Sequence, residues 1–482
     1  MSKVKIISTI GPASLSRETL RAMFEAGMNV ARLNGSHADP AWHARAIGVI
    51  RETLPDVPIL LDIPGRKIRT CALTREPAFR IGETVTLTTD PDDRGTDKVP
   101  VNYPDLHRDL EPGATLLADD GTLRFTVTEI KGRDIVCRAE VDGVLRSCKG
   151  INVPFITLRA PLVTQRDASM VEFAKSQDVD FIGISFVESA EHVGAVRKAA
   201  GGRRPRIVSK IENEDGMENL DEVIAATDAI MIDRGDLSVE TGPETLVPFQ
   251  KRIIERTRAA GKPVIVATEM LHSMIKNPFP TKAEVSDITN AVLDGCAAIM
   301  LSGETAVGDY PVECVSFMRR IADAATDYHQ SAEDASERAR ADRVASAMDD
   351  AIALICRRLP ITKIVAVTIS GYAARMIAAR QPKQPILAVT NDPQAYRSFN
   401  LLPGTEGIHV DIPFSRTSTD HIALCLEELW RRGKLDDDDL VLVTAVGYPF
   451  SGNRMNLVQT HRVHHLARTL AWCRQDREVA YG

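Results

Sequence analysis

The stretch RIVSKIENEDGMENLDEVIAATDAIMIDRGD, residues 206–236, contains the structural unit that decides the fold. Its two short runs, 206–211 and 229–232, are apolar and rich in β-branched residues, and each is followed by polar residues. A helix-like segment connects the two runs. Continuous apolar strands that alternate with helices indicate a parallel sheet with both faces covered.

The same unit recurs through the first two thirds of the chain. Eight apolar runs follow the pattern, at residues 4–10, 28–33, 58–63, 180–186, 206–211, 229–232, 263–267 and 297–301. Eight such units predict a closed (β/α)8 TIM barrel, an α/β fold. An open doubly wound sheet is the alternative that periodicity alone does not exclude, but the number of units favours the barrel.

Two further domains interrupt and follow the predicted barrel. Residues 64–179 are too many for one crossover connection, and they contain alternating stretches at 81–89, 115–118, 123–130 and 134–141. We predict a barrel at 1–69 and 155–335, with a small inserted all-β domain, a β-barrel lid, at 70–154. This insert leaves from the carboxyl end of strand three, so it can close over the barrel mouth. After a charged linker or exposed helix, runs at 363–368, 385–390, 409–412 and 440–446 predict a C-terminal α/β domain of regulatory type at 340–482.

The composition is typical of a globular protein and argues against several classes of function. The 482 residues carry a formal net charge of -7, which argues against a general binder of nucleic acid or membrane surfaces. No run of eighteen apolar residues occurs, and the apolar run near the start is too short for a signal peptide. Eight cysteines without a Cys-x-x-Cys pair predict reduced thiols in a cytoplasmic protein.

Polar residues gather where the predicted barrel strands end, which is where such barrels carry their active sites. Glu212 and Asp236 offer carboxylate oxygens on neighbouring strands, which suit Mg²⁺ or Mn²⁺. Three cations, Arg32, Arg69 and Lys210, suit a phosphorylated substrate. The whole set favours a metal and phosphate site over ion pairs that only rim the barrel; its other members are Asn34, Ser36, His37, Asp62, Arg234, Gly235, Thr268, Glu269, Ser302 and Glu304.

Neither a Walker-type motif nor the glycine fingerprint of a dinucleotide fold occurs in the sequence. A nucleotide would therefore meet side chains and metal, with Arg32, residues 34–37, Arg69 and Lys149 as candidates. Lys149 lies where the insert rejoins the barrel. A solvated surface lysine is the alternative for Lys149, and spacing alone does not exclude it.

Six segments resemble the pyruvate kinase family and occur in the family's order. They are KIISTIGPAS (5–14), AGMNVARLNGSH (26–37), SKIE (209–212), RGDL (234–237), KPVIVATEMLHSM (262–274) and IMLSGETAVGDYP (299–311). The domain pattern resembles the family from end to end. The resemblance implies a glycolytic phosphotransferase, a homotetramer, that transfers phosphate from phosphoenolpyruvate to ADP to give pyruvate and ATP.

The resemblance also implies a role for each matching residue. Arg32 and Lys210 would contact the transferring phosphoryl group, and Lys210 would offset charge on the developing enolate. Glu212 and Asp236 would hold the Mg²⁺ or Mn²⁺ ion. Thr268 would stand beside the carbon that is protonated, as the third catalytic residue. Substrate binding would use Arg32, Lys210, Gly235, Asp236 and Thr268, and nucleotide phosphates would meet Asn34, Gly35, Ser36, His37, Arg69 and Lys149.

Many family members also bind K⁺, and its ligand positions match Asn34, Ser36, Asp62 and the backbone carbonyl of Ile63. In those enzymes the third strand continues as DTKGPEIR, whereas residues 62–69 read DIPGRKIR, so Lys67 replaces a glutamate. An ammonium is a +1 charge of similar size to K⁺ on a flexible stem that can reach the same cavity. We therefore predict that Lys67 replaces K⁺ and that K⁺ is not required; the alternative is a solvent-facing Lys67 with K⁺ still bound.

Other departures from the family pattern keep two further hypotheses open. Asp233, Glu188 and Glu269 replace the family's Ala, Arg and Gln and bring negative charge toward the mouth; Gly35, Ser238 and Val307 also depart. The alternatives are a lyase-like paralogue that uses Mg²⁺-enolate chemistry on another 2-oxo acid, and a non-catalytic metabolite sensor. The retained catalytic positions favour the kinase. Because the loops 368–374 and 447–454 lack the usual effector pattern, we expect no strong response to fructose 1,6-bisphosphate.

Overall fold

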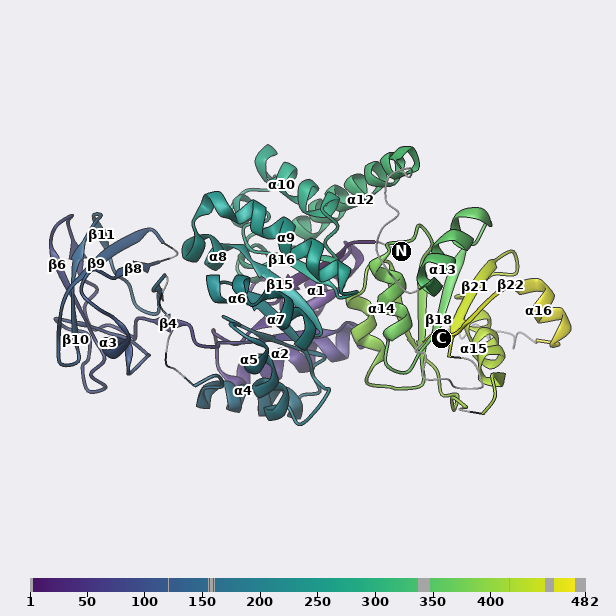
Figure 1. Ribbon diagram of the computed structural model, residues 1–482, viewed down its shortest axis with the longest axis horizontal. Coiled ribbons are helices and arrows are strands. Elements are labelled where there is room, and N and C mark those ends of the chain that lie inside the picture. The colour runs from purple at the N-terminus through teal and green to yellow at the C-terminus, as the bar shows by residue number, and fades with distance from the viewer. Residues whose placement is uncertain are drawn as a thin grey trace.

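The computed structural model describes residues 3–119, 121–154, 156, 159, 161–336, 347–415, 417–446 and 455–472. Figure 1 shows three bodies in a row, with the barrel in the middle, the inserted β-sheet body at one end and the C-terminal α/β body at the other. The inserted body, which contains strands β4 to β12, is called the lid below.

The eight predicted apolar runs form a closed barrel of parallel strands in the order β1-β17-β16-β15-β14-β13-β3-β2. The strands are β1 (Lys5–Thr9), β2 (Val30–Asn34), β3 (Ile59–Ile63), β13 (Phe181–Ile184), β14 (Arg206–Ile211), β15 (Ala229–Asp233), β16 (Val264–Ala267) and β17 (Ala298–Leu301). Nearly every strand residue is buried, as expected for a sheet that side chains fill on the inside and helices cover on the outside. The predicted (β/α)8 fold is confirmed.

Helices surround the barrel, and their starts follow from the sequence. Thr164 and Thr281 begin their helices with reciprocal capping boxes to Asp167 and Glu284. Residues 326–336 of the charged segment after the barrel continue the last of the barrel helices. The helices are α1 (Arg17–Glu25), α2 (Pro40–Thr53), α4 (Gln165–Ser176), α5 (Ala190–Ala199), α6 (Glu214–Glu218), α7 (Leu220–Ala226), α8 (Arg234–Thr241), α9 (Leu246–Ala259), α10 (Lys282–Leu293), α11 (Gly303–Ala306) and α12 (Pro311–Ser336).

The lid is built on a seven-stranded sheet in the order β4-β12-β8-β9-β10-β6-β7. An isolated bridge between Thr70 and Val101, directly after β4 and β7, joins the two edges of this sheet. The sheet thus includes residues 68–69, before the predicted insert begins. Its elements are β4 (Ile68–Arg69), β6 (Thr84–Thr88), β7 (Val99–Pro100), β8 (Thr115–Ala118), β9 (Leu123–Lys131), β10 (Asp134–Ala139) and β12 (Gly150–Asn152), with β5 (Ala78–Phe79), β11 (Gly143–Val144) and α3 (Leu106–Asp109) beside it.

The C-terminal body is a five-stranded sheet in the order β20-β19-β18-β21-β22. The predicted strand at 409–412 was placed too late, because the residues after the turn at Gly404 already pair with β19. The antiparallel strand β22 was not predicted, since its sequence LVQTHR is polar and lies half-buried at the edge. The elements are α13 (Ala347–Arg358), β18 (Lys363–Val367), α14 (Tyr372–Ala379), β19 (Ile386–Thr390), β20 (Thr405–His409), α15 (Asp420–Arg431), β21 (Leu440–Ala445), β22 (Leu457–Arg462) and α16 (Val463–Thr469).

Three sequence expectations concern features outside these sheets. Loop 447–454 lies outside the described residues. The seven cysteines within the described residues are free thiols. No helix among the described residues is both long and apolar enough to span a membrane.

Candidate active site

Five charged side chains from β2, β3, β15 and the end of β14 meet at the barrel mouth. Two guanidinium nitrogens of Arg32 donate to Asp62 Oδ2 at 2.6 and 3.0 Å. The Lys210 ammonium lies 2.6 Å from Glu212 Oε1, 3.0 Å from Asp233 Oδ2 and 3.9 Å from Asp62 Oδ2. All five residues are buried, so each charge is fixed by its neighbours rather than by water.

The carboxylates decide the charge state of Lys210. Burial alone would lower the pKa of this ammonium, but Glu212, Asp233 and Asp62 hold the pKa above its usual value. Burial also raises the pKa of Glu212, and the Lys210 ammonium opposes that shift. Lys210 is therefore a permanent positive charge at the mouth, already oriented toward any anion that binds there.

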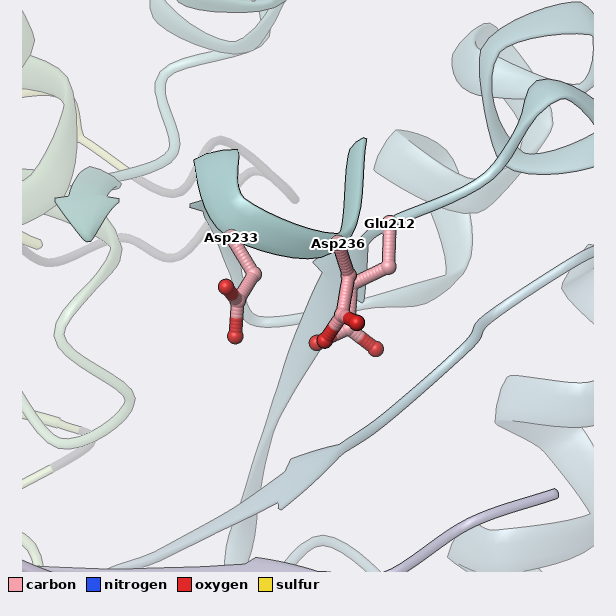
Figure 2. A group of neighbouring side chains, drawn as sticks. All are labelled: Glu212, Asp233 and Asp236. Atoms are coloured by element: carbon pink, nitrogen blue, oxygen red, sulfur yellow. The ribbon is translucent and has the colours of Figure 1, made fainter. Parts of the chain in front are cut away.

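Three carboxylates, Glu212, Asp233 and Asp236, form a group whose nearest oxygens all lie within 4.8 Å of one another. Figure 2 shows that the three side chains point to the same side: Glu212 directly follows β14, Asp233 ends β15, and Asp236 lies in the first turn of α8. Glu212 Oε1 is buried and accepts no well-directed hydrogen bond in the described part of the chain. Carboxylate oxygens in this arrangement fit a hard divalent cation such as Mg²⁺ or Mn²⁺.

Thr268 stands directly after β16 with φ of 68°, a left-handed conformation that is rare for a β-branched residue. Contacts from the neighbouring strand end hold it there: Arg234 donates to the Thr268 carbonyl at 2.7 Å, and the Gly235 amide donates to Thr268 Oγ1 at 2.9 Å. Backbone strain of this kind persists where surrounding structure enforces it, most often at functional sites. The hydroxyl and the amide that the sequence assigned to substrate are thus neighbours.

The candidate nucleotide residues fall into two groups. Residues 34–37 lie at the end of β2 and directly after it, at the barrel mouth. Arg69 lies on β4 of the lid and pairs with Gly150, and Lys149 directly precedes β12. Desolvation lowers the pKa of His37, and the positive charges of Arg69 and Arg32 lower it further. The two groups of residues therefore share one positively charged region. The Lys149 ammonium forms an ion pair with Asp119 of the lid at 2.7 Å.

Lys67 lies elsewhere than the sequence predicted. Its ammonium contacts both carboxylate oxygens of Asp236, at 2.5 and 2.7 Å, and none of its hydrogen bonds to described residues reaches Asn34, Ser36 or Asp62. The solvent-facing alternative does not hold either, because only 13% of the side chain is exposed. The reason is electrostatic: Asp236 shares its buried surroundings with two other carboxylates, whereas the Asp62 carboxylate is already paired with Arg32.

Comparison with known proteins identifies the family. Residues 1–315 match the model of the pyruvate kinase barrel domain, and residues 346–461 match the model of the pyruvate kinase alpha/beta domain. The chain belongs to the pyruvate kinase family. It is 38% identical to the pyruvate kinase of Clostridium perfringens, over 94% of this chain and 97% of that protein. It is 37% identical to that of Mycobacterium intracellulare, over 95% and 98%. It is therefore an enzyme of a phosphotransferase family.

The structure separates the three acidic departures from the pyruvate kinase pattern. Glu188 forms an ion pair with Arg66 at 2.5 Å, so its charge is balanced. Glu269 is exposed to solvent. Asp233 alone joins the buried cluster around Lys210. Sequence reasoning noticed Asp233 as a substitution but did not place it in the site; its spacing of three residues from Asp236, across the start of a helix, was the available signal.

The glycine at position 35 also has a structural explanation. A Cβ atom at Gly35 would lie 2.4 Å from the Asp62 carbonyl oxygen and 2.9 Å from Met170 Cε. The backbone approaches Asp62 too closely for a side chain at this position. Gly35 therefore lets the segment after β2 pack directly on β3.

Proposed function

We propose that this member of the pyruvate kinase family transfers a phosphoryl group from phosphoenolpyruvate to ADP, giving pyruvate and ATP. The observation that carries the proposal is the buried Lys210 ammonium, held between Glu212 and Asp233 and one ion pair away from Arg32. Phosphoryl transfer depends mainly on positioning and on neutralising charge, and this arrangement supplies fixed positive charge where a phosphoryl group would pass.

Each residue has a role that fits its surroundings. Arg32 and Lys210 bind the phosphoryl group, and Lys210 stabilises the enolate oxygen. Glu212 and Asp236 hold the divalent cation, which supplies Lewis-acid stabilisation of phosphate and carboxylate charge when it is bound. The Gly235 amide orients the substrate carboxylate. Thr268 lies beside the carbon that accepts a proton, directly or through water.

The proposed nucleotide site lies between the barrel and the lid. Asn34, Gly35, Ser36 and His37 would meet the phosphates from the barrel side. Arg69 and Lys149 would meet them from the lid, with Lys149 exchanging its ion pair with Asp119 for a phosphate. This exchange is plausible chemically because the Lys149 side chain is already 36% exposed. The homotetramer, the cytoplasmic location and the weak response to fructose 1,6-bisphosphate stay predictions.

The test is ATP formation from phosphoenolpyruvate and ADP in a coupled assay, with Lys210→Met as the diagnostic variant. The variant should keep its fold and lose at least about 100-fold in kcat, the scale for removing one preorganised charge from a transition state. Near-normal turnover by a folded Lys210→Met enzyme would contradict the assignment. Wild-type chain that forms pyruvate from another 2-oxo acid, or that binds metabolites without turnover, would instead support the lyase-like paralogue or the sensor.

We further propose that turnover does not require K⁺. Lys67 supports this by placing an ammonium group at the mouth, although on Asp236 rather than on the predicted K⁺ ligands. Asp62 Oδ1 is buried and accepts no hydrogen bond from the described residues. The test must therefore distinguish an enzyme that works without K⁺ from one that binds K⁺ at this oxygen. We expect equal turnover in tetramethylammonium buffer with and without KCl at matched ionic strength. Strong activation by K⁺ would refute the proposal.

A further inference from the structure

Helix α8 of the barrel contacts the lid, or the residue that leads into it, at three places. The Lys67 ammonium binds Asp236. Asn152 of β12 donates to Glu240 Oε1 at 2.6 Å. A Cβ atom at Gly121, in the turn between β8 and β9, would lie 3.2 Å from a Val239 methyl group, so that turn also reaches α8. Figure 1 shows α8 at the edge of the barrel that faces the lid.

The Lys67 contact differs from the other two because it uses a proposed metal ligand. The ammonium engages both Asp236 oxygens, and the two side chains are only 13% and 12% exposed. A divalent cation needs a lone pair of the same carboxylate at close range. Two cations sharing one buried carboxylate repel each other strongly, because little water is present to screen them. The ammonium and the metal ion therefore compete for Asp236.

Lys67 also lies next to β4 and β12, the paired strands at which the chain enters and leaves the lid; these two strands are called the hinge. Lys67 directly precedes β4, whose residue Arg69 pairs with Gly150 of β12. Its stem passes over Gly150, where a Cβ atom would lie 3.0 Å from Lys67 Cε. The Lys67 carbonyl accepts a hydrogen bond from Asn102 of the lid at 3.2 Å. If Lys67 leaves Asp236, the residues that move are those that lead directly into β4, where the lid joins the barrel.

We propose that Lys67 is a positioning residue that binds Asp236 in alternation with the divalent cation, so that metal binding releases the lid hinge from α8. In its contact with Asp236 the Lys67 ammonium also lies 5.5 Å from the centroid of the Phe186 ring. After release, the incoming phosphates supply it with new partners. The inference rests on the proposed function in one respect, since that function makes Asp236 a metal ligand. It assigns to Lys67 a role in metal affinity and in lid movement.

The first test measures Mn²⁺ binding to the full chain without substrate. The electron paramagnetic resonance signal of free Mn²⁺ reports how much of the ion stays unbound. Lys67→Met should bind Mn²⁺ at least about tenfold more tightly than wild type, the factor expected if Lys67 occupies Asp236 for about nine tenths of the time. The matched control is Lys98→Met, which removes another lid lysine paired with a carboxylate, Asp134, at 2.6 Å. That variant should bind Mn²⁺ like wild type.

The second test follows the hinge by hydrogen exchange of the β4 and β12 amides. Metal should speed exchange there in wild type, and Lys67→Met should show the faster exchange without metal. Equal or weaker Mn²⁺ binding by Lys67→Met, or an exchange rate that metal does not change, would overturn the inference. Lys67→Gln replaces Lys67→Met if the latter does not fold. Because neither test involves turnover, a chain that passes both but forms no ATP would refute the proposed function and leave this inference standing.

Discussion

Asp233 shows how a single buried carboxylate changes the charge of a whole site. It lies 3.0 Å from the Lys210 ammonium, and only 6% of it is exposed. Although burial favours the neutral acid, Lys210 holds the pKa of Asp233 below its usual value, so the side chain is an anion. An anion here partly cancels the positive charge that Lys210 offers to a phosphorylated substrate.

Asp233→Ala should therefore strengthen substrate binding. We expect the half-saturating phosphoenolpyruvate concentration to fall by roughly three- to tenfold at saturating Mg²⁺, because one negative charge leaves a buried site close to the phosphate. Lys210 keeps two other carboxylate partners, so the fold should be retained. Initial-rate kinetics at saturating ADP give the measurement.

The control for this variant is Glu269→Ala, which removes an exposed carboxylate after β16. Its charge is screened by water, so the half-saturating concentration should change less than about twofold. An equal decrease in both variants would show that overall charge, rather than the position of Asp233, sets the affinity.

At the scale of strands, the site depends on how closely β3 and β13 approach. Gly183 faces Asp62 across the two strands, and a Cβ atom at Gly183 would lie 1.9 Å from Asp62 Oδ1. The absence of a side chain there leaves room for the carboxylate that orients Arg32. The glycine is therefore part of the machinery that positions Arg32.

Gly183→Ala should displace Asp62 and leave Arg32 poorly oriented. We expect kcat/KM to fall by at least about tenfold, equivalent to about 1.4 kcal/mol of transition-state stabilisation, while circular dichroism stays unchanged. The control is Gly194→Ala in α5, where no heavy atom beyond the neighbouring residues and the helix's own backbone lies within 4 Å of the added methyl group. That variant should be more stable by about 0.5–1 kcal/mol, because alanine favours the helix, and should keep full activity.

The same elements show which features of the site the sequence predicts and which it does not. Strand ends are readable because apolar runs end at polar residues, so Lys210, Glu212 and Asp236 could be placed together before any coordinates were known. The partner of Lys67 could not be predicted, since it depends on the path of the hinge and not on spacing along one strand. For the same reason, the sequence did not predict that Arg66 neutralises the charge of Glu188, because the two residues are 122 positions apart in the chain.

At the scale of the whole molecule, the lid and the barrel share a buried carboxyl group. Glu240 of α8 accepts a hydrogen bond from Asn152 of the lid. Both residues line a cavity of about 230 Å³ between the two bodies. Burial raises the pKa of Glu240 to about 7, and the hydrogen bond from Asn152 only partly opposes that shift. We therefore expect the contact between lid and barrel to depend on pH near neutrality.

The sign of this dependence follows from proton linkage. The folded chain holds the Glu240 proton up to about pH 7, whereas the unfolded chain releases it near the ordinary glutamate pKa of 4.5. Glu240 therefore lowers the stability progressively as pH rises between these two values. Glu240→Gln stays neutral throughout. Its stability relative to wild type should increase by about 3 kcal/mol from pH 4.5 to pH 8, as measured by denaturant unfolding. Glu129→Gln, an exposed lid variant, should show no such change. If the difference in unfolding free energy between Glu240→Gln and wild type does not change with pH, water reaches this carboxylate freely and the lid does not bury it.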